Sequence, residues 1–139
     1  MNEPVVADIA RVIQLAVAPV FLLLAVGSVL GILTSRLARI IDRGRILAAK
    51  AEAPDVRHEL DVLGRRARLI NFGITMGVTT ALFVGAVIVT LFFGELTATP
   101  LGYVVAVEFS LAMVAFIAAL LAFLREIFLA TGTLHFGKR

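Results

Sequence analysis

The sequence predicts an all-α integral membrane protein with three transmembrane helices, of which the first and second extend into a cytoplasmic antiparallel helical hairpin. Three observations support this fold class. Of the 139 residues, 60% are apolar and the mean hydropathy is +1.02, whereas soluble domains are about half apolar. The apolar residues form three long runs that are nearly free of charge, and the segment between the first two runs repeats apolar residues at helical spacing.

The three runs are each long enough to cross a bilayer. Residues 12–33 contain no Asp, Glu, Lys or Arg, and at about 1.5 Å per residue a helix of this length spans a hydrocarbon core of about 30 Å. Residues 69–93 form a second uncharged run, longer than a crossing requires, so we expect tilt or an emergent end. Residues 103–124 form the third run, in which Glu108 is the only charged side chain.

Basic residues are concentrated on one side of the predicted spans. Nine Lys and Arg lie within residues 34–68 and three more within residues 125–139, whereas the opposite side carries Arg11 and several acidic residues. The positive-inside rule therefore predicts that the N-terminus lies outside and that the segment 34–68 and the tail 125–139 are cytoplasmic.

The segment 34–68 carries its own helical pattern on both sides of a break at Pro54. Apolar residues recur at spacings of four and three, which predicts two helical seams that face each other. Each arm of this hairpin would be roughly 25 Å long. The seam residues are Leu33, Leu37, Ile40, Gly44, Leu47 and Ala51 on the first arm, and Val56, Leu60, Leu63, Ala67 and Ile70 on the second.

The outer face of the hairpin is expected to be basic. One interpretation is that its charges set topology and contact anionic lipid headgroups, where each basic group contributes about 1 kcal/mol; the other is a docking site for a cytoplasmic partner. Nucleic-acid binding is not expected, because acidic residues interrupt the positive charge and no aromatic residue is interleaved for base stacking. The residues of this face are Arg36, Arg39, Arg43, Arg65, Arg66 and Arg68.

Small residues at fourfold spacing predict close helix packing within the membrane. On the second span such a ridge permits close backbone approach, and a short polar ridge about half a turn away is poorly placed against lipid, so we expect protein or water on both sides of this helix. The packing residues are Gly73, Gly77, Ala81 and Gly85 on the second span, Gly27 and Gly31 on the first, and Ala112, Ala115 and Ala119 on the third. The polar ridge comprises Asn71, Thr75 and Thr79.

Glu108 requires an explanation, because a carboxylate at the centre of a membrane helix costs about 2.5 to 3.5 kcal/mol on insertion scales, and less toward an end. It lies on the same face as the alanines of the third span, so we expect it to point into a helix bundle. Two roles remain open: a carboxyl, neutral or paired with Arg11 or Gln14, that fastens helices, or a cation or proton site on a pathway that the polar ridge continues.

The sequence contains no arrangement typical of an enzyme. There is no Cys, and His58 and His135 are far apart in the chain. Zinc-binding His-Glu-x-x-His, phosphate-binding Gly-x-x-x-x-Gly-Lys-Ser/Thr and Gly-x-Ser-x-Gly motifs are missing from the sequence. We therefore predict a protein without catalytic activity, metal or cofactor.

Several segments resemble a family of uncharacterised bacterial three-helix inner-membrane proteins, domain of unknown function 2721. They are Ala18-Pro19-Val20-Phe21-Leu22, the run from Arg36 to Arg43, the run from Arg65 to Asn71, and Phe123-Leu124-Arg125-Glu126. The resemblance implies a bacterial inner-membrane location and a three-helix architecture, and it implies no activity. The order of spans is also similar to that of the pentameric proton-channel stators of energy-transducing motors, which is an analogy of layout.

Two functions are consistent with these features. The first is a homo-oligomer, assembled through the small-residue faces, that conducts ions or protons like a channel. The alternative is an accessory or scaffold subunit that docks on a larger membrane complex through its helices and its basic cytoplasmic hairpin.

Overall fold

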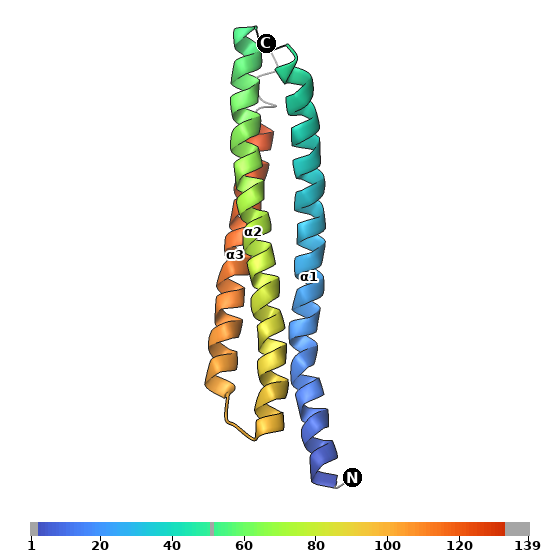
Figure 1. Ribbon diagram of the computed structural model, residues 1–139. Coiled ribbons are helices and arrows are strands. Elements are labelled where there is room, and N and C mark those ends of the chain that lie inside the picture. The colour runs from blue at the N-terminus through green and yellow to red at the C-terminus, as the bar shows by residue number, and fades with distance from the viewer. Residues whose placement is uncertain (1–2, 51, 133–139) are drawn as a thin grey trace.

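The computed structural model describes residues 3–50 and 52–132, which form three long α-helices (Figure 1). Helix α1 comprises Glu3–Ala48, α2 comprises Pro54–Thr97, and α3 comprises Gly102–Gly132. Each contains a stretch that is long and apolar enough to cross a membrane. The predicted fold class is therefore confirmed, with α3 continuing past the end of the third apolar run.

Helix α2 is the central element of the bundle. It packs against α1 on one side and against α3 on the other. In Figure 1 the α1–α2 pair extends well beyond the C-terminal end of α3, so the tip of the hairpin stands apart from the third helix. Along the apolar spans α2 contacts both other helices, and at the end opposite the hairpin tip α1 extends past the end of α2 (Figure 1).

The hairpin is held by the apolar seam that the sequence predicts. Its buried core consists of two rows that meet between α1 and α2, and burial of such side chains stabilises the pair by about 1.5 to 3 kcal/mol each. Gly44 is half-buried with open space beside it, and Ala51 lies outside the described residues. The core residues are Leu33, Ile40, Leu47, Leu63 and Ile70, flanked by Leu37, Val56, Leu60 and Ala67.

The turns at the two ends of α2 use different local chemistry. Ala53 is extended (φ −84°, ψ 137°) and its carbonyl accepts the N–H groups of Val56 and Arg57, while Pro54 begins the helix, where a missing N–H costs nothing. At the other end Ala98 is left-handed (φ 50°) and its N–H donates to the Glu95 carbonyl, which ends the helix in an αL cap.

The predicted small-residue ridge of α2 lies partly inside the bundle. A Cβ at Gly73 would lie 3.2 Å from Leu33 Cδ1 and 3.5 Å from the Ala119 carbonyl oxygen, and one at Gly77 would lie 2.7 Å from Leu30 Cδ2. These two glycines let α1 approach α2 closely. Ala81 and Gly85 are half-buried, and the α3 alanines Ala112, Ala115 and Ala119 are buried.

Helix α1 places its two ridge glycines differently. Gly27 and Gly31 are exposed, and a Cβ at either would meet nothing within 4 Å. Neither therefore takes part in helix packing within a single chain, and this face of α1 is open to lipid or to another protein.

Candidate functional site

Three charged side chains, one from each helix, converge on a single point. The Glu126 carboxylate of α3 accepts hydrogen bonds from Arg66 Nε and Nη2 at its Oε1 (3.0 and 2.8 Å), and from Arg36 Nε at its Oε2 (2.9 Å). Arg36 Nη2 also lies 2.9 Å from Oε2. We call this group, Arg36, Arg66 and Glu126, the arginine clasp; its two cations flank one anion.

Burial makes the clasp energetically important. The Glu126 side chain is 0% exposed, whereas those of Arg36 and Arg66 are 33% and 21% exposed. Burial of a carboxylate is costly unless hydrogen bonds or opposite charges offset its lost hydration, and charge-assisted hydrogen bonds of this kind are about twice as strong as neutral ones. The Arg36 guanidinium also lies over the Phe123 ring, 5.6 Å from its centroid, in a cation–π contact.

The clasp lies where all three helices leave their apolar spans. Arg36 follows the first apolar run (12–33), Arg66 precedes the second (69–93), and Glu126 follows the third (103–124), each by about one helical turn or less. The clasp therefore ties α1, α2 and α3 together at one end of their apolar segments, and through it α1 contacts α3 directly.

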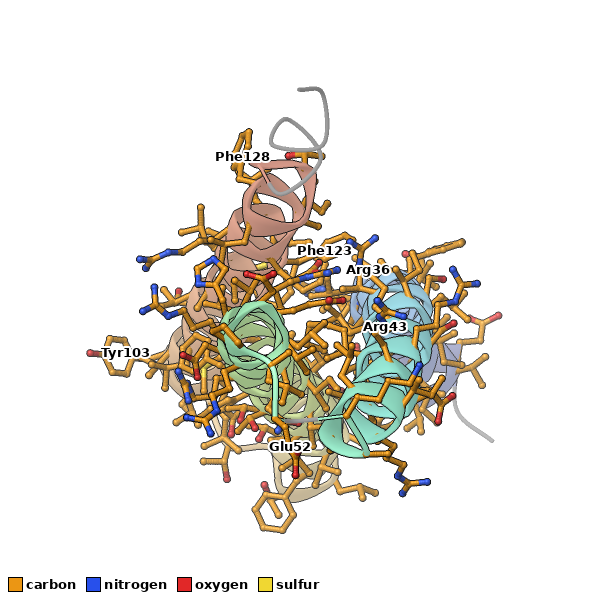
Figure 2. All side chains as sticks on the ribbon, turned by 90° about the horizontal axis from the view of Figure 1, so that it is seen from above. Arg36, Arg43, Glu52, Tyr103, Phe123 and Phe128 are labelled. Atoms are coloured by element: carbon orange, nitrogen blue, oxygen red, sulfur yellow. The ribbon has the colours of Figure 1, made fainter. Side chains whose placement is uncertain are left out.

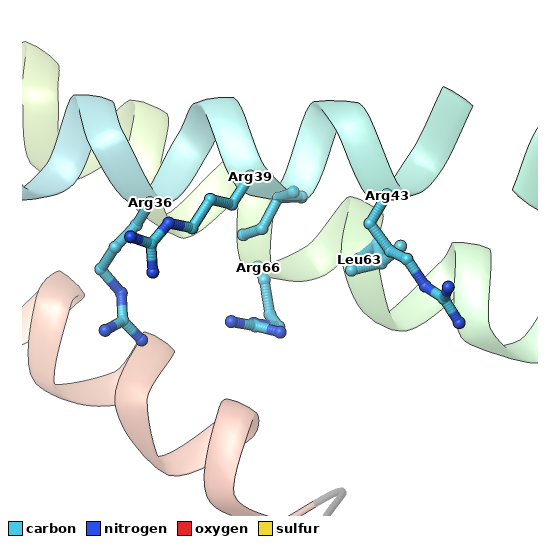
Figure 3. Close-up of a pocket in the computed structure, with 6 residues that line it drawn as sticks. Arg36, Arg39, Arg43, Leu63 and Arg66 are labelled. Atoms are coloured by element: carbon cyan, nitrogen blue, oxygen red, sulfur yellow. The ribbon is translucent and has the colours of Figure 1, made fainter. Parts of the chain in front are cut away.

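The six arginines predicted to form one outer basic face are instead divided. Arg36 and Arg66 turn inward to Glu126, and together with Arg39, Arg43, Ile40 and Leu63 they line a depression of about 240 Å³ (Figure 3). Figure 2 shows Arg36 and Arg43 along the same side of α1, with Phe123 near Arg36.

The remaining two, Arg65 and Arg68, line a second depression on α2 and α3. The six arginines therefore do not form the single outer face that was expected. The reason is geometric: the arginines of each arm lie on more than one side of their helix, and the sequence alone does not show which side α3 covers.

Arg43 of α1 forms an exposed ion pair with Glu59 of α2. Its Nε and Nη2 each lie 2.9 Å from Glu59 Oε1, which links the two arms of the hairpin. Both side chains are about half exposed, and exposed pairs contribute about 0 to 1 kcal/mol. This pair therefore adds little to the stability that the apolar seam supplies.

Glu108 has a different neighbour from those expected. Its Oε1 accepts a hydrogen bond of 3.1 Å from Thr90 Oγ1 on α2, and its Oε2 is buried without a partner in the described residues. Arg11 and Gln14 are exposed on α1, so the suggested pairing with either is not formed in this chain. Glu108 instead links α2 to α3 and keeps one oxygen without a donor.

The polar ridge of α2 does not join Glu108 in one site. Asn71 and Thr75 are exposed and Thr79 is half-buried; Thr75 Oγ1 donates to the Asn71 carbonyl and Thr79 Oγ1 to the Thr75 carbonyl, both at 2.9 Å. The Thr90 partner of Glu108 lies about 16 Å further along the helix than Thr79. Within one chain, the four candidate pathway residues are therefore not gathered.

The sequence interpretation missed Glu126, because its position after the third apolar run placed it in the predicted tail. A signal was nevertheless present. The buried seam of α3 comprises Ala112, Ala115, Ala119 and Ala122, and the same spacing continued by one more turn reaches Glu126. A carboxylate in register with a packing seam indicates a buried partner of opposite charge.

The chemistry of these groups does not indicate a metal site. In the ranges 3–50 and 52–132, no three His, Cys, Asp or Glu side chains are grouped closely enough to hold a metal ion. His58 is exposed on α2, and His135 lies outside the described residues.

Comparison with known proteins gives a family but no described relative. No curated protein and no solved structure matches the chain significantly. A family model described as "Protein of unknown function (DUF2721)" matches residues 16–136, which include most of the first span, all of the second and third, and the whole arginine clasp. The chain therefore belongs to the DUF2721 family.

Proposed function

We propose that this chain is a non-enzymatic protein of the bacterial inner membrane that functions as a homo-oligomer and forms a channel-like path for ions or protons. In the proposed orientation the N-terminus lies outside, and the α1–α2 hairpin and the C-terminus lie in the cytoplasm. The clustering of basic residues at the hairpin end supports this orientation.

The observation that carries the proposal is the exposed polar ridge of α2. Asn71 and Thr75 are exposed although they lie within the apolar segment of the helix. Polar side chains in membrane segments normally face a bundle interior or a water-filled cavity. A second copy of the chain, packed against this side of α2, supplies such an interior, and several copies around an axis turn the ridge into the lining of a path.

The open face of α1 supports self-assembly independently. Gly27 and Gly31 are one turn apart on an exposed surface with free space beside them. Small residues at this spacing permit close approach of another membrane helix. Neither glycine is used within the chain, so both remain available to a neighbouring copy.

Glu108 is the proposed ion or proton site of this path. Its buried Oε2 atom has no donor among the described residues, so it retains the capacity to accept a proton or to contact a cation. By contrast, Glu126 is engaged on both oxygens by arginines and serves to fix the helices. The lack of grouped catalytic side chains in the sequence is consistent with a non-enzymatic role.

The first experiment is native mass spectrometry of the protein extracted gently into lipid nanodiscs. A uniform complex of four or more copies is expected, since roughly this number of small protomers is needed to enclose a path. A monomer would refute the proposal. Flux through reconstituted vesicles then tests Glu108→Gln, which should retain the assembly and reduce conduction; unchanged flux in this variant would refute the assignment of Glu108.

The orientation has a separate test. The chain contains no Cys, so single cysteines introduced at Ala49, at the hairpin tip, and at Thr99, in the α2–α3 connection, report the side of the membrane through labelling with an impermeant maleimide. Ala49→Cys should react only after the membrane is opened, and Thr99→Cys should react in intact cells. The reverse pattern would overturn the orientation.

A second candidate function is an accessory subunit of a larger membrane complex. The observation that favours it is the hairpin tip, which projects beyond the C-terminal end of α3 (Figure 1). Under this alternative, native mass spectrometry finds foreign subunits in the complex, Gly27→Leu removes them, and Glu108→Gln has little effect.

A further inference from the structure

Three arginines from two helices gather at a depression that is distinct from the clasp. Arg65 and Arg68 of α2 and Arg125 of α3 line it together with Leu69 and Leu129, and its volume is about 320 Å³. All three arginine side chains are exposed. We call this the Arg65–Arg68–Arg125 pocket.

Among the described residues, no carboxylate forms an ion pair with the three arginines of this pocket. The three ion pairs formed among the described residues all involve other arginines, namely Arg36, Arg43 and Arg66. Asp61, one turn before Arg65 on the same helix, is not among the paired carboxylates. Glu126 is adjacent to Arg125 in sequence, but both its oxygens are occupied within the arginine clasp.

Three cations brought together without a carboxylate repel one another. An anion bound between them removes this repulsion. The planar guanidinium group binds phosphate oxygens through paired N–H donors, which makes arginine clusters well suited to phosphate groups.

The position of the pocket along the membrane helices indicates which kind of phosphate compound it binds. Arg68 immediately precedes the second apolar run, which begins at Leu69, and Arg125 immediately follows the third, which ends at Leu124. The guanidinium groups therefore lie at the boundary between hydrocarbon and water, where phospholipid phosphates reside. Leu69 and Leu129 give the same pocket an apolar wall for the start of an acyl chain.

We propose that the Arg65–Arg68–Arg125 pocket is a specific binding site for the phosphate group of an anionic phospholipid. Basic pockets at the cytoplasmic ends of membrane helices are known to hold such headgroups. The proposal requires only that the three helices span the membrane, and it does not depend on the number of copies or on conduction. An anionic lipid is favoured over a zwitterionic one because the pocket contributes three cations and no anion.

The experiment is native mass spectrometry of the delipidated full-length protein in detergent, with stepwise addition of phosphatidylglycerol or of phosphatidylethanolamine carrying the same acyl chains. The first phosphatidylglycerol should bind more tightly than the first phosphatidylethanolamine. Arg68→Gln and Arg125→Gln should each weaken that first binding event by about fivefold, the loss expected for one basic group near a lipid phosphate.

Arg45→Gln is the matched control, because Arg45 is exposed near the end of α1, on the same side of the membrane, and lines neither arginine depression. It should leave the binding unchanged. Equal weakening by Arg45→Gln would show diffuse attraction and overturn the site, as would equal binding of the two lipids. Circular dichroism checks that each variant keeps its helices.

A further measurement distinguishes a bound lipid from a bound soluble anion. Inorganic phosphate is added at constant ionic strength to the wild-type protein loaded with phosphatidylglycerol. Retention of the lipid supports the proposal. Two results together would overturn the lipid assignment: phosphate displaces the lipid, and phosphate alone raises the melting temperature of the wild-type protein but not of Arg125→Gln. They would assign the pocket to a soluble phosphate compound.

Discussion

Arg66 and Glu126 lie 60 residues apart in the chain, yet the Arg66 guanidinium donates two hydrogen bonds, of 3.0 and 2.8 Å, to one carboxylate oxygen of Glu126. This pair joins the central helix α2 to α3, and the second oxygen of the same carboxylate receives Arg36 from α1. The only direct charged link between the two outer helices in the described part of the chain thus passes through one buried acid. The following predictions test this arrangement and the packing around it.

Replacing Glu126 should destabilise the bundle more than replacing any exposed acid. Glu126→Gln leaves two guanidinium groups facing each other without an anion, and because both arginines are partly exposed we expect a loss of about 2 to 3 kcal/mol, below the full cost of breaking a buried pair. The measurement is the free energy of unfolding from titration with sodium dodecyl sulfate, followed by circular dichroism.

Glu59→Gln is the matched control for that measurement, because Glu59 also pairs with an arginine but is about half exposed. Its loss should be within about 1 kcal/mol. Similar losses for the two variants would mean that burial of Glu126 does not contribute to stability.

Two adjacent isoleucines test the hairpin core. Ile40 is 6% exposed in the core, whereas Ile41, about 100° further round the same helix, is 44% exposed. Ile40→Ala should lower the free energy of unfolding by about 2 to 5 kcal/mol through lost burial and a cavity, whereas Ile41→Ala should change it by about 0.5 kcal/mol or less. Equal effects would contradict the assigned register of the hairpin.

Two glycines of the same α2 ridge should respond differently to a larger side chain. Gly73 is enclosed by Leu33 and by the Ala119 backbone, whereas Gly85 has open space beside it. Gly73→Leu should separate the helices and lower the melting temperature in detergent, because a well-packed interface does not accept added volume without strain. Gly85→Leu should leave the melting temperature nearly unchanged; a comparable fall in both variants would argue against this packing.

Gly27 distinguishes the stability of one chain from assembly. Since its surroundings in the chain are open, Gly27→Leu should leave the melting temperature of the monomer in detergent unchanged. In nanodiscs the same variant should reduce the number of copies found by native mass spectrometry, because a leucine blocks close approach of a neighbouring helix. An unaltered copy number would exclude this face of α1 from the interface.

Much of the fold could be predicted because it depends on local patterns. The seam from Leu33 to Leu47 and its counterpart from Leu63 to Ile70 repeat apolar residues at the spacing that a helical pair requires, and the structure packs these two rows together. The glycines Gly73 and Gly77 were likewise recognisable, because fourfold spacing of small residues places them on one side of a helix.

The candidate site was less accessible to such reasoning. Glu108 attracted attention as a charge within an apolar run, but its partner Thr90 lies on another helix and is common in membrane segments for other reasons. Glu126 lay just outside the run and received no role, although it is the most completely buried acid of the described chain. Gly27 and Gly31 matched the same spacing as Gly73 and Gly77 but face away from the bundle.

The sequence by itself determined the number of helices, the positions of their apolar spans and the hairpin, because hydropathy and a 3.6-residue period act within each segment. Only the tertiary structure decided which of the six arginines turn inward to Glu126 and which do not. Which arginines reach Glu126 depends on where α3 packs against α2. Helix periodicity predicts the face on which a side chain lies, but it does not predict which other helix covers that face. The pairing of Arg36 and Arg66 with Glu126, and the lack of an ion pair at Arg65, Arg68 and Arg125 within the described residues, follow from that one packing relation.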